Sequence, residues 1–414
     1  MAVWQEKRLV EVAEINMGQS PKSIYYNKDN IGTPFLQGNG DFGRIFPIIT
    51  TYTSSVTKLA HAGDILFSVR APVGAINIAN TAVCIGRGLS SIRSKENYNH
   101  IFLRYSLEYL VNEIKKSSNG AIFDSITKND LYNSRISIPD LATQEKIADI
   151  LSTYDDLIEN NNRRIEILEQ MAQEIYKEWF VRFRFPGHEK VKFVSSKLGK
   201  LPQTFNVVNA ESLFEFYIGG GWGNENISEN FPIEANVIRG TDIPNVRKYD
   251  ISSCPVRYHK ISNYKSRQLV NGDIVMEISG GTADQPVGRC ALITQELIDR
   301  FKNGNVICAS FCKLIRLNKN LISPYFCYYW LQYLYDTRII DRFQLQSTGI
   351  INFKFEAFLK KGLIMLPPMN IMLQFENYVK YIVQEINMLA SQNQNLIKQR
   401  DLLLPRLMSG KLEV

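Results

Sequence analysis

The sequence predicts a mixed α/β (α+β) fold in which two globular domains, related by a pseudo-twofold axis, are joined by two long helices forming an antiparallel coiled coil. Two observations support this prediction. Two long stretches carry apolar residues at coiled-coil spacing, and the sequence repeats itself once, weakly, over its whole length. The length of 414 residues is also too great for a single hydrophobic core.

The coiled-coil signal is an alternation of three- and four-residue steps. In residues 141–185 the spacing runs through Ile147, Leu151, Tyr154, Ile158, Asn161, Ile165, Leu168, Ala172, Ile175 and Trp179. In residues 369–407 it runs through Phe375, Val379, Ile382, Ile386, Leu389, Asn393, Leu396, Arg400 and Leu403. Such a seam needs a second helix to cover it.

The two seams can be placed in register from the sequence. When Asn161 is set opposite Asn393 in an antiparallel pair, the remaining layers match from Leu151 with Leu403 to Trp179 with Phe375. A polar pair weakens the seam but fixes its register, because any slip would bury an unpaired amide. The alternative is that each helix packs on another helix and the match is chance; we favour the antiparallel pair.

The repeat sets the domain boundaries. The matched segments are Gly63-Asp64-Ile65-Leu66 with Gly272-Asp273-Ile274-Val275, Ser91-Ile92-Arg93 with Leu314-Ile315-Arg316, helical patterns at 102–116 and 325–338, Asn119-Gly120-Ala121-Ile122 with Thr348-Gly349-Ile350-Ile351, and Gln144 with Gln374. We predict a first domain over 1–140, a long helix over 141–185, a connector over 186–202 after a Pro-Gly break, a second domain over 203–368 and a long helix over 369–414.

Composition narrows the class of function. Lys and Arg number 48 against 41 Asp and Glu, and the net charge of +7 permits binding to nucleic acid. No apolar run approaches the roughly 20 residues that span a membrane, so we expect a cytoplasmic protein without membrane contact. Six cysteines without paired spacing indicate reduced, buried thiols, and with only four histidines we expect no metal site.

The closing segments of the two repeats resemble the specificity subunit of type I restriction-modification enzymes. The resemblance lies in the Gly-Ala-Ile and Gly-Ile-Ile turns, the Gln-led helices and, most specifically, residues 398–412, KQRDLLLPRLMSGKL. It implies a non-catalytic protein whose two domains each recognise half of a bipartite double-stranded DNA target. It also implies docking of two methyltransferase (modification) subunits and of restriction/translocase subunits. S-adenosylmethionine, ATP and Mg would be bound by those partners, and no cofactor by this chain.

The residues themselves agree that no catalytic group is present. Leu366-Pro367-Pro368-Met369 lacks the polar residue and the aromatic of an adenine methyltransferase motif, and the glycines of 219–223 are not followed by the Lys of a phosphate loop. Glu113-x-Lys115 lies on an amphipathic helix, where a solvated face is the favoured reading, and Ser55-x-x-Lys58 is a short match expected by chance. The coil, about 30 paired residues or roughly 45 Å long, suits two major-groove faces about 34 Å apart better than a small-molecule pocket.

We expect DNA contacts in polar, Gly-rich loops, since Arg, Lys, Asn, Gln and Ser match base edges and phosphates. The candidates are Gln19, Ser20, Lys22, Gln37, Asn39, Arg70 and Arg87 in the first domain, and Trp222, Asn224, Arg239, Thr241, Ser279, Thr282, Gln346 and Ser347 in the second. Arg70 and Arg239 could contact guanine or phosphate, and Asn39 and Gln346 adenine. For each of them a local turn role is the alternative.

Amide-rich faces of the long helices, outside the seams, predict partner docking. We select Tyr176, Leu402 and Leu407 as docking residues; the alternative is an ordinary solvated coil surface. Two other classes of function stay open. One is a self-contained site-specific methyltransferase or nuclease, and the other is a two-headed scaffold that binds proteins. Modification or cleavage of DNA by the purified chain would establish the first, and a lack of salt-dependent DNA binding would favour the second.

Overall fold

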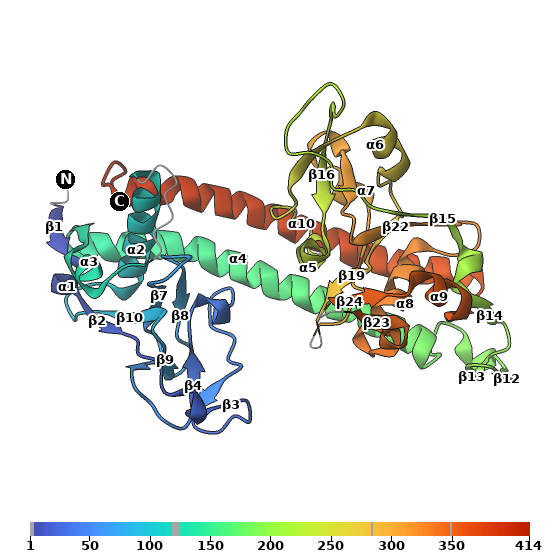
Figure 1. Ribbon diagram of the computed structural model, residues 1–414, viewed down its shortest axis with the longest axis horizontal. Helices are drawn as coiled ribbons and strands as arrows, with labels where there is room; N and C mark the ends of the chain where they lie inside the picture. The colour runs from blue at the N-terminus through green and yellow to red at the C-terminus, as the bar shows by residue number, and fades with distance from the viewer. Residues whose placement is uncertain (1–3, 118–124, 283–284, 348–349) are drawn as a thin grey trace. The chain divides into compact units, whose positions relative to one another are not determined.

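The protein is described by a computed structural model covering residues 4–117, 125–282, 285–347 and 350–414. The chain divides into two compact units, the first formed by Met1–Ile158 with Asn395–Val414 and the second by Glu159–Gln394 (Figure 1). The long helices α4 (Leu141–Tyr176) and α10 (Met369–Met408) contribute residues to both units. The unit boundaries therefore fall inside the long helices, whereas the predicted domain boundaries lie at their ends.

The first unit is built around an antiparallel four-stranded sheet. Its strands follow the order β2-β10-β7-β8, with bounds β2 (Ala13–Met17), β7 (Ile65–Ser68), β8 (Ile76–Ile78) and β10 (Leu89–Ser94). A second sheet follows the order β3-β5-β4-β9-β6, with bounds β3 (Tyr26–Asn27), β4 (Thr33–Leu36), β5 (Tyr52–Thr53), β6 (Leu59–Ala60) and β9 (Val83–Ile85). In this sheet β4 and β9 run parallel.

Helices complete the first unit. They are α1 (Leu9–Val12), α2 (His100–Ser117) and α3 (Lys128–Asn133), and β1 (Gln5–Arg8) pairs with β11 (Arg135–Ile138). The core is formed by the buried faces of α2, the four-stranded sheet and the long helices, and it includes Phe102, Tyr105, Leu151 and Leu407. The last turns of α10 are therefore part of the first unit.

The second unit contains a four-stranded sheet of matching order, β15-β22-β18-β20. Its strands are β15 (Phe214–Gly219), β18 (Ile274–Glu277), β20 (Cys290–Leu292) and β22 (Cys312–Leu317). Beside it, β16 (Ile233–Ile238) pairs in parallel with β21 (Val306–Cys308) and antiparallel with β17 (Val256–His259).

The second unit also contains five α-helices that are shorter than α4 and α10, and further short strands, in the part of the chain that the structure describes. The helices are α5 (Ile243–Val246), α6 (Ile261–Arg267), α7 (Gln295–Ile298), α8 (Pro324–Asp336) and α9 (Phe355–Lys361). The strands are β14 (Asn206–Asn209) with β25 (Leu363–Leu366), and β19 (Ser279–Gly281), β23 (Gln344–Ser347) and β24 (Ile350–Phe353). Aromatic rings of α8, α9 and the long helices, such as Phe326, Phe358 and Phe375, form the largest core.

The structure confirms the internal repeat in atomic detail. Gly63 and Gly272 have φ values of 88° and 92°, which favour glycine, and each is the third residue of the turn before an equivalent strand. The next residue is a buried aspartate in both units. Asp64 accepts from Arg93 Nε at 2.6 Å, and Asp273 accepts from Arg316 Nε at 2.8 Å. The predicted matches at this turn and its partner strand are therefore correct, although the match of 119–122 with 348–351 lies partly outside the described residues.

One predicted correspondence is wrong. Strands β11 and β25 and the starts of α4 and α10 all match when Gln144 is aligned with Met372, two residues before Gln374. Gln144 is buried and accepts from the backbone N–H of Asn99, whereas Gln374 is exposed. The shared residue type misled the alignment because helix position, rather than identity, decides which side chain faces the core.

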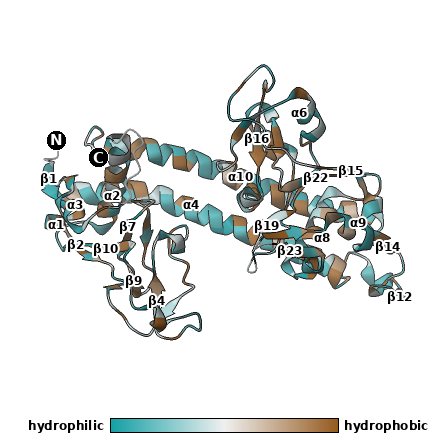
Figure 2. Cartoon of the chain, viewed as in Figure 1, coloured by the Kyte–Doolittle hydropathy of each residue, from teal (hydrophilic) through white to brown (hydrophobic). Residues whose placement is uncertain are grey.

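The two long helices pack together with the predicted register. Asn161 Nδ2 donates to Asn393 Oδ1 at 3.0 Å, and both residues are buried. In the same unit Ile165, Ile386 and Leu389 share one core cluster, and the rings of Trp179 and Phe375 lie 6.0 Å apart. Brown and teal alternate along both helices in Figure 2, as expected of a seam with a polar outer face. The predicted fold class, with mixed helix and strand units and long helices that pack together, is confirmed.

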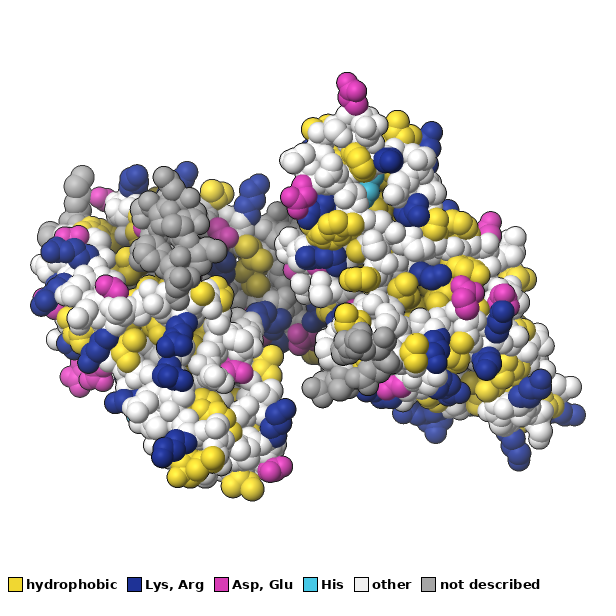
Figure 3. Space-filling view, viewed as in Figure 1, with side chains coloured by type: hydrophobic (Ala, Val, Ile, Leu, Met, Phe, Trp, Pro, Cys, Tyr) yellow, Lys and Arg dark blue, Asp and Glu magenta, His cyan; other side chains and the backbone are white. Residues whose placement is uncertain are grey.

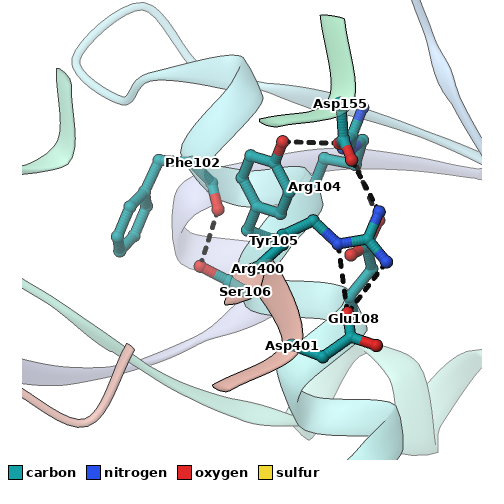
Figure 4. A network of polar contacts seen from close by, with 8 residues as sticks. All are labelled: Phe102, Arg104, Tyr105, Ser106, Glu108, Asp155, Arg400 and Asp401. Carbon is teal, nitrogen blue, oxygen red and sulfur yellow. Dashed lines mark hydrogen bonds and ion pairs between the residues drawn. The ribbon is translucent and has the colours of Figure 1, made fainter. Parts of the chain in front are cut away.

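One predicted layer is occupied by an ionic network. Arg400, expected opposite Tyr154, donates from Nη1 to Asp155 Oδ1 at 2.6 Å. Asp155 also accepts from Tyr105 at 2.6 Å and from Arg104, and Arg104 pairs with Glu108 at 3.4 Å (Figure 4). This network ties the C-terminal end of α10 to α2 and α4 within the first unit.

Several sequence expectations can be compared with local structure. Helix α4 ends at Tyr176 and continues as a π-helical turn, Lys177–Val181, short of the predicted end at residue 185. The segment expected to be a plain connector contains a hairpin of β12 (Phe193–Ser196) and β13 (Gly199–Pro202). All six cysteines are free and buried, as predicted.

Among the described residues no helix is long and apolar enough to span a membrane.

Candidate nucleic-acid interface

In the first unit, four loop segments meet at one edge of the sheets. They follow β2, β4 and β7 and connect β9 to β10, and their backbones are joined to one another. Gly18 N–H donates to Leu89 O at 2.9 Å, Gln19 N–H to Ile85 O at 2.9 Å and Gly86 N–H to Leu36 O at 2.8 Å. Loops tied to each other in this way can hold polar side chains in fixed positions.

Close backbone packing brings several predicted DNA contacts together. An added Cβ at Gly86 would lie 3.0 Å from Gln37 Cα and 3.1 Å from Ser20 Oγ, and Ser20 Oγ accepts from Arg87 N–H at 3.2 Å. Ser20, Gln37 and Arg87 therefore form one cluster. Gln19 lies at its edge, and its carbonyl accepts from Thr57 Oγ1.

Two arginines border a hollow at this cluster. Met17, Val69, Arg70, Arg87, Ser125 and Ile126 line a volume of about 410 Å³. Both arginines are exposed, so the hollow could receive a phosphate or the acceptor atoms of a guanine. Dark blue Lys and Arg side chains also lie over the neighbouring lobe that holds β3, β4 and β9 (Figure 3).

The other two candidates in the first unit lie on separate turns. Asn39 begins a 3-10 turn, Asn39–Asp41, and Asp41 Oδ2 caps this turn by accepting from Gln37 N–H at 2.9 Å. Lys22 is exposed and precedes the 3-10 turn Ser23–Tyr25. Their geometry is compatible with DNA contact, which stays a prediction.

The second unit repeats this edge with different side chains. Gly220 N–H donates to Cys312 O at 3.0 Å, Gly221 N–H to Cys308 O at 2.9 Å and Ala309 N–H to Ile238 O at 2.8 Å. These bonds match, strand for strand, those of Gly18, Gln19 and Gly86. Burial of the Cys308 thiol behind the edge raises its pKa to about 12, so this thiol stays protonated at neutral pH.

Arg239 is held within its own turn. Its Nε and Nη2 donate to Asp242 at 2.9 Å each, and Nη2 also donates to Ser253 O at 2.7 Å. The hydrogen bond to Asp242 raises the pKa of Arg239. A bidentate contact to guanine would require these donors to leave Asp242, so in this conformation Arg239 serves the turn. Thr241 is exposed on the same turn, Gly240–Asp242.

Several of the remaining candidates of the second unit contact neighbouring residues through ring stacking or hydrogen bonds. Trp222 stacks with Arg257, whose guanidinium carbon lies 4.6 Å from the ring centroid. Asn224 Oδ1 accepts from Glu225 N–H, Ser279 Oγ donates to Asn352 Oδ1 at 2.7 Å, and Thr282 Oγ1 accepts from Gln285 N–H. The backbones of Gln346 and Ser347 lie in β23, but their side chains lie outside the described residues.

Sequence reasoning missed an ion pair beneath this edge. Glu277, 2% exposed at the end of β18, accepts from Arg289 Nε at 2.9 Å and from Nη2 at 2.7 Å. An added Cβ at Gly240 would clash with Glu277, so the pair supports the turn that carries Thr241. The sequence does carry a signal for this ion pair, because Glu277 ends an otherwise apolar strand.

The predicted docking residues need correction. Tyr176 is 4% exposed and Leu407 is fully buried, because each packs into the core of its own unit. Neither can offer surface to a partner, so the prediction is wrong for these two. Leu402 is 57% exposed and stays a candidate. Among the described residues no group of three or more side chains has the arrangement of a metal site.

Comparison with known proteins gives this geometry its context. Residues 1–170 match a family model described as "Type I restriction modification DNA specificity domain". These residues belong to the type I restriction-modification specificity family. The resemblance predicted from the sequence is confirmed, and the edge built from β2, β4, β7 and β9 belongs to the matched domain.

Individual relatives extend the likeness over the whole chain. A putative type I restriction enzyme MjaX specificity subunit of Methanocaldococcus jannaschii is 45% identical over 163 residues, 39% of this chain and 38% of that protein. The match thus spans well under half of that relative's length. The MjaIX specificity subunit of the same organism is 23% identical over 99% of this chain and 94% of its own. The crystal structure of a type I S subunit from M. genitalium, 14% identical, covers 98% of this chain and 96% of its own at a TM-score of 0.50, which shows a shared fold.

Proposed function

We propose that this specificity-family chain is the sequence-reading subunit of a type I restriction-modification system. Each unit would recognise one half of a bipartite double-stranded DNA target, and the paired helices would set the spacing. The supporting observation is that the same four-loop edge occurs in both units with different side chains. One scaffold presented twice suits the reading of two different half-sites.

The chemistry would belong to partner subunits. We propose that two methyltransferase subunits with S-adenosylmethionine, and restriction/translocase subunits with ATP and Mg, assemble on this chain in the cytoplasm. The chain itself would be non-catalytic. If so, the purified chain with S-adenosylmethionine or with Mg and ATP leaves DNA unmodified and uncut. Modification by the chain alone would instead establish a self-contained enzyme.

Methylation mapping tests the reading function. The chain and its cognate methyltransferase are expressed in a host without type I systems, and modified adenines are mapped across the genome. We expect one motif of two short half-sites separated by a fixed gap. A continuous motif would contradict two separate readers. Absence of methylation, with the complex intact, would contradict DNA reading and favour a protein-binding scaffold.

Docking is tested on the exposed candidate. Leu402→Asp should lower the amount of methyltransferase that co-purifies with the chain, because it places a charge on an exposed apolar position of α10. Ile397→Asp, at a 39% exposed residue of the same helix, is the matched comparison. Equal yields for the Leu402 variant and the wild type would remove Leu402 from the docking surface.

A further inference from the structure

Phe311 is an exposed aromatic residue on a rigid turn of the second unit. Its exposed fraction is 64%, although phenylalanine is usually buried. The residue lies between β21 and β22, where Cys312 N–H donates to Ala309 O at 2.8 Å and closes the turn. Ile278 N–H donates to Phe311 O at 2.8 Å, which joins the turn to the segment after β18. The backbone is therefore fixed while the ring faces solvent.

This turn belongs to the predicted DNA-reading edge. The bond to Ile278 places Phe311 beside the segment that carries Ser279 and Gly280. Ala309 N–H reaches Ile238 O, immediately before Arg239 and the turn with Thr241. Among the described residues, an added Cβ at Gly280 would have one heavy atom within 4 Å, Glu277 Oε1 at 3.9 Å, so the backbone there is open to close approach.

The first unit shows what occupies the same position in the repeat. There Leu89 N–H donates to Gly86 O at 3.0 Å and Val69 N–H donates to Gly88 O at 2.9 Å. These bonds align Phe311 with Gly88 and Ser310 with Arg87. At the place of Phe311 the first unit therefore has Gly88, and its exposed arginine, Arg87, lies one residue earlier on the same turn.

A ring at this position can recognise one group on the major-groove edge of DNA. The 5-methyl of thymine is the apolar group exposed there, whereas the other groups are hydrogen-bond donors and acceptors. We propose, resting on the DNA-reading function above, that Phe311 contacts the 5-methyl group of a thymine in the half-site read by the second unit. On the equivalent turn of the first unit, Arg87, one position earlier, is the candidate for a polar contact.

A double-mutant cycle tests the contact. The mapped target supplies the duplex, and each thymine of the second half-site is replaced in turn by uracil, which lacks only the methyl group. Binding of the complex with its methyltransferase is measured for wild type and Phe311→Ala. At one position the wild type should lose about tenfold in affinity, a size typical of one buried methyl group. Phe311→Ala should bind thymine and uracil DNA equally.

Two further variants keep the test decisive. Phe311→Leu retains apolar contact and should keep part of the discrimination. Leu321→Ala changes an exposed apolar residue, 44% exposed, beyond the other end of β22 and should behave as wild type. The methyl contact would be overturned if Phe311→Ala lost affinity equally for thymine and uracil DNA and still distinguished the two as the wild type does. A wild type that ignores every thymine-to-uracil change would also overturn it.

The role proposed for Phe311 can be refuted while the proposed DNA-reading function stands. If the wild-type complex methylates a bipartite motif but does not distinguish thymine from uracil, only the role of Phe311 is refuted. If the wild type shows no sequence-dependent binding or methylation, the reading function itself fails, and the role of Phe311 falls with it.

Discussion

The side-chain amide of Asn161 donates to Oδ1 of Asn393 at 3.0 Å, and Asn393 donates to Oδ1 of Asn162 at the same distance. Asn161 and Asn393 are each 7% exposed within an otherwise apolar seam. An amide buried without a partner costs more than its hydrogen bond contributes, so this pair selects one register of α4 against α10.

Breaking one member of the pair should destabilise the second unit. Asn161→Leu leaves the Asn393 amide with a lost partner in the seam, and we expect the free energy of unfolding to fall by about 1–3 kcal/mol. Asn161→Leu with Asn393→Leu should recover most of this loss, because both partners are then apolar. Urea unfolding followed by circular dichroism measures Asn161→Leu, Asn393→Leu and the double variant. A double variant whose loss equals the sum of the two single losses would contradict the pairing.

Acid should weaken the first unit through Asp155. Burial alone would raise its pKa, but hydrogen bonds from Tyr105 and Arg400 and the charge of Arg104 outweigh burial and lower it. A carboxylate with a lowered folded pKa contributes stability above its unfolded pKa of about 4, and this contribution is lost as pH falls through the folded pKa.

Asp155→Asn should remove this pH dependence. At pH 7 we expect a loss of roughly 2 kcal/mol, since Arg104 and Arg400 lose a shared anionic partner. Below pH 4 the difference from wild type should shrink. Thermal unfolding between pH 3 and pH 7 measures it, and Asp156→Asn, at an exposed neighbouring carboxylate, is the control. A difference that stays constant over this range would contradict the lowered pKa.

A single methyl group at Gly220 should disturb the second reading edge. A Cβ there would clash with the carbonyl oxygens of Cys308 and Ala309, whereas a Cβ at Gly219 would meet no atom of the described part of the chain within 4 Å. We expect Gly220→Ala to cost about 1–3 kcal/mol by overpacking and Gly219→Ala to be better tolerated. In methylation maps, Gly220→Ala should weaken the second half of the motif and leave the first half intact. Equal effects of the two substitutions would show that the clash is relieved.

Arg87 should contribute to the first half-site. Arg87 is exposed and its backbone N–H donates to Ser20 Oγ in the cluster, so Arg87→Ala should weaken binding of the complex to its target by about 1–3 kcal/mol. If Arg87 contacts a base, its loss should also relax the first half of the motif. If it contacts a phosphate, its loss should instead reduce the slope of log affinity against log salt concentration by about one. Arg135→Ala, an exposed arginine paired with Glu6, removes the same charge and should change neither property. Unchanged binding by Arg87→Ala would remove Arg87 from the interface.

The sequence alone determined the long helices, their register and the repeat. Each depends on spacing within the chain: the seam of Ile165 and Leu389 follows from alternating steps, and the Asn161 layer follows from a single polar position in each seam. The Gly63 and Gly272 turns were equally readable, because a glycine at positive φ followed by a capping aspartate is a local pattern.

Only the tertiary structure decided which side chains are exposed and which are already paired. Tyr176 and Leu407 lie off the seam but are buried by segments distant in the sequence, and Arg239 is engaged by Asp242 and Ser253. The exposure of Phe311 was equally hidden, since an aromatic before an apolar strand normally indicates core. Burial and pairing depend on contacts between residues far apart in the chain, and periodicity within one segment cannot specify them.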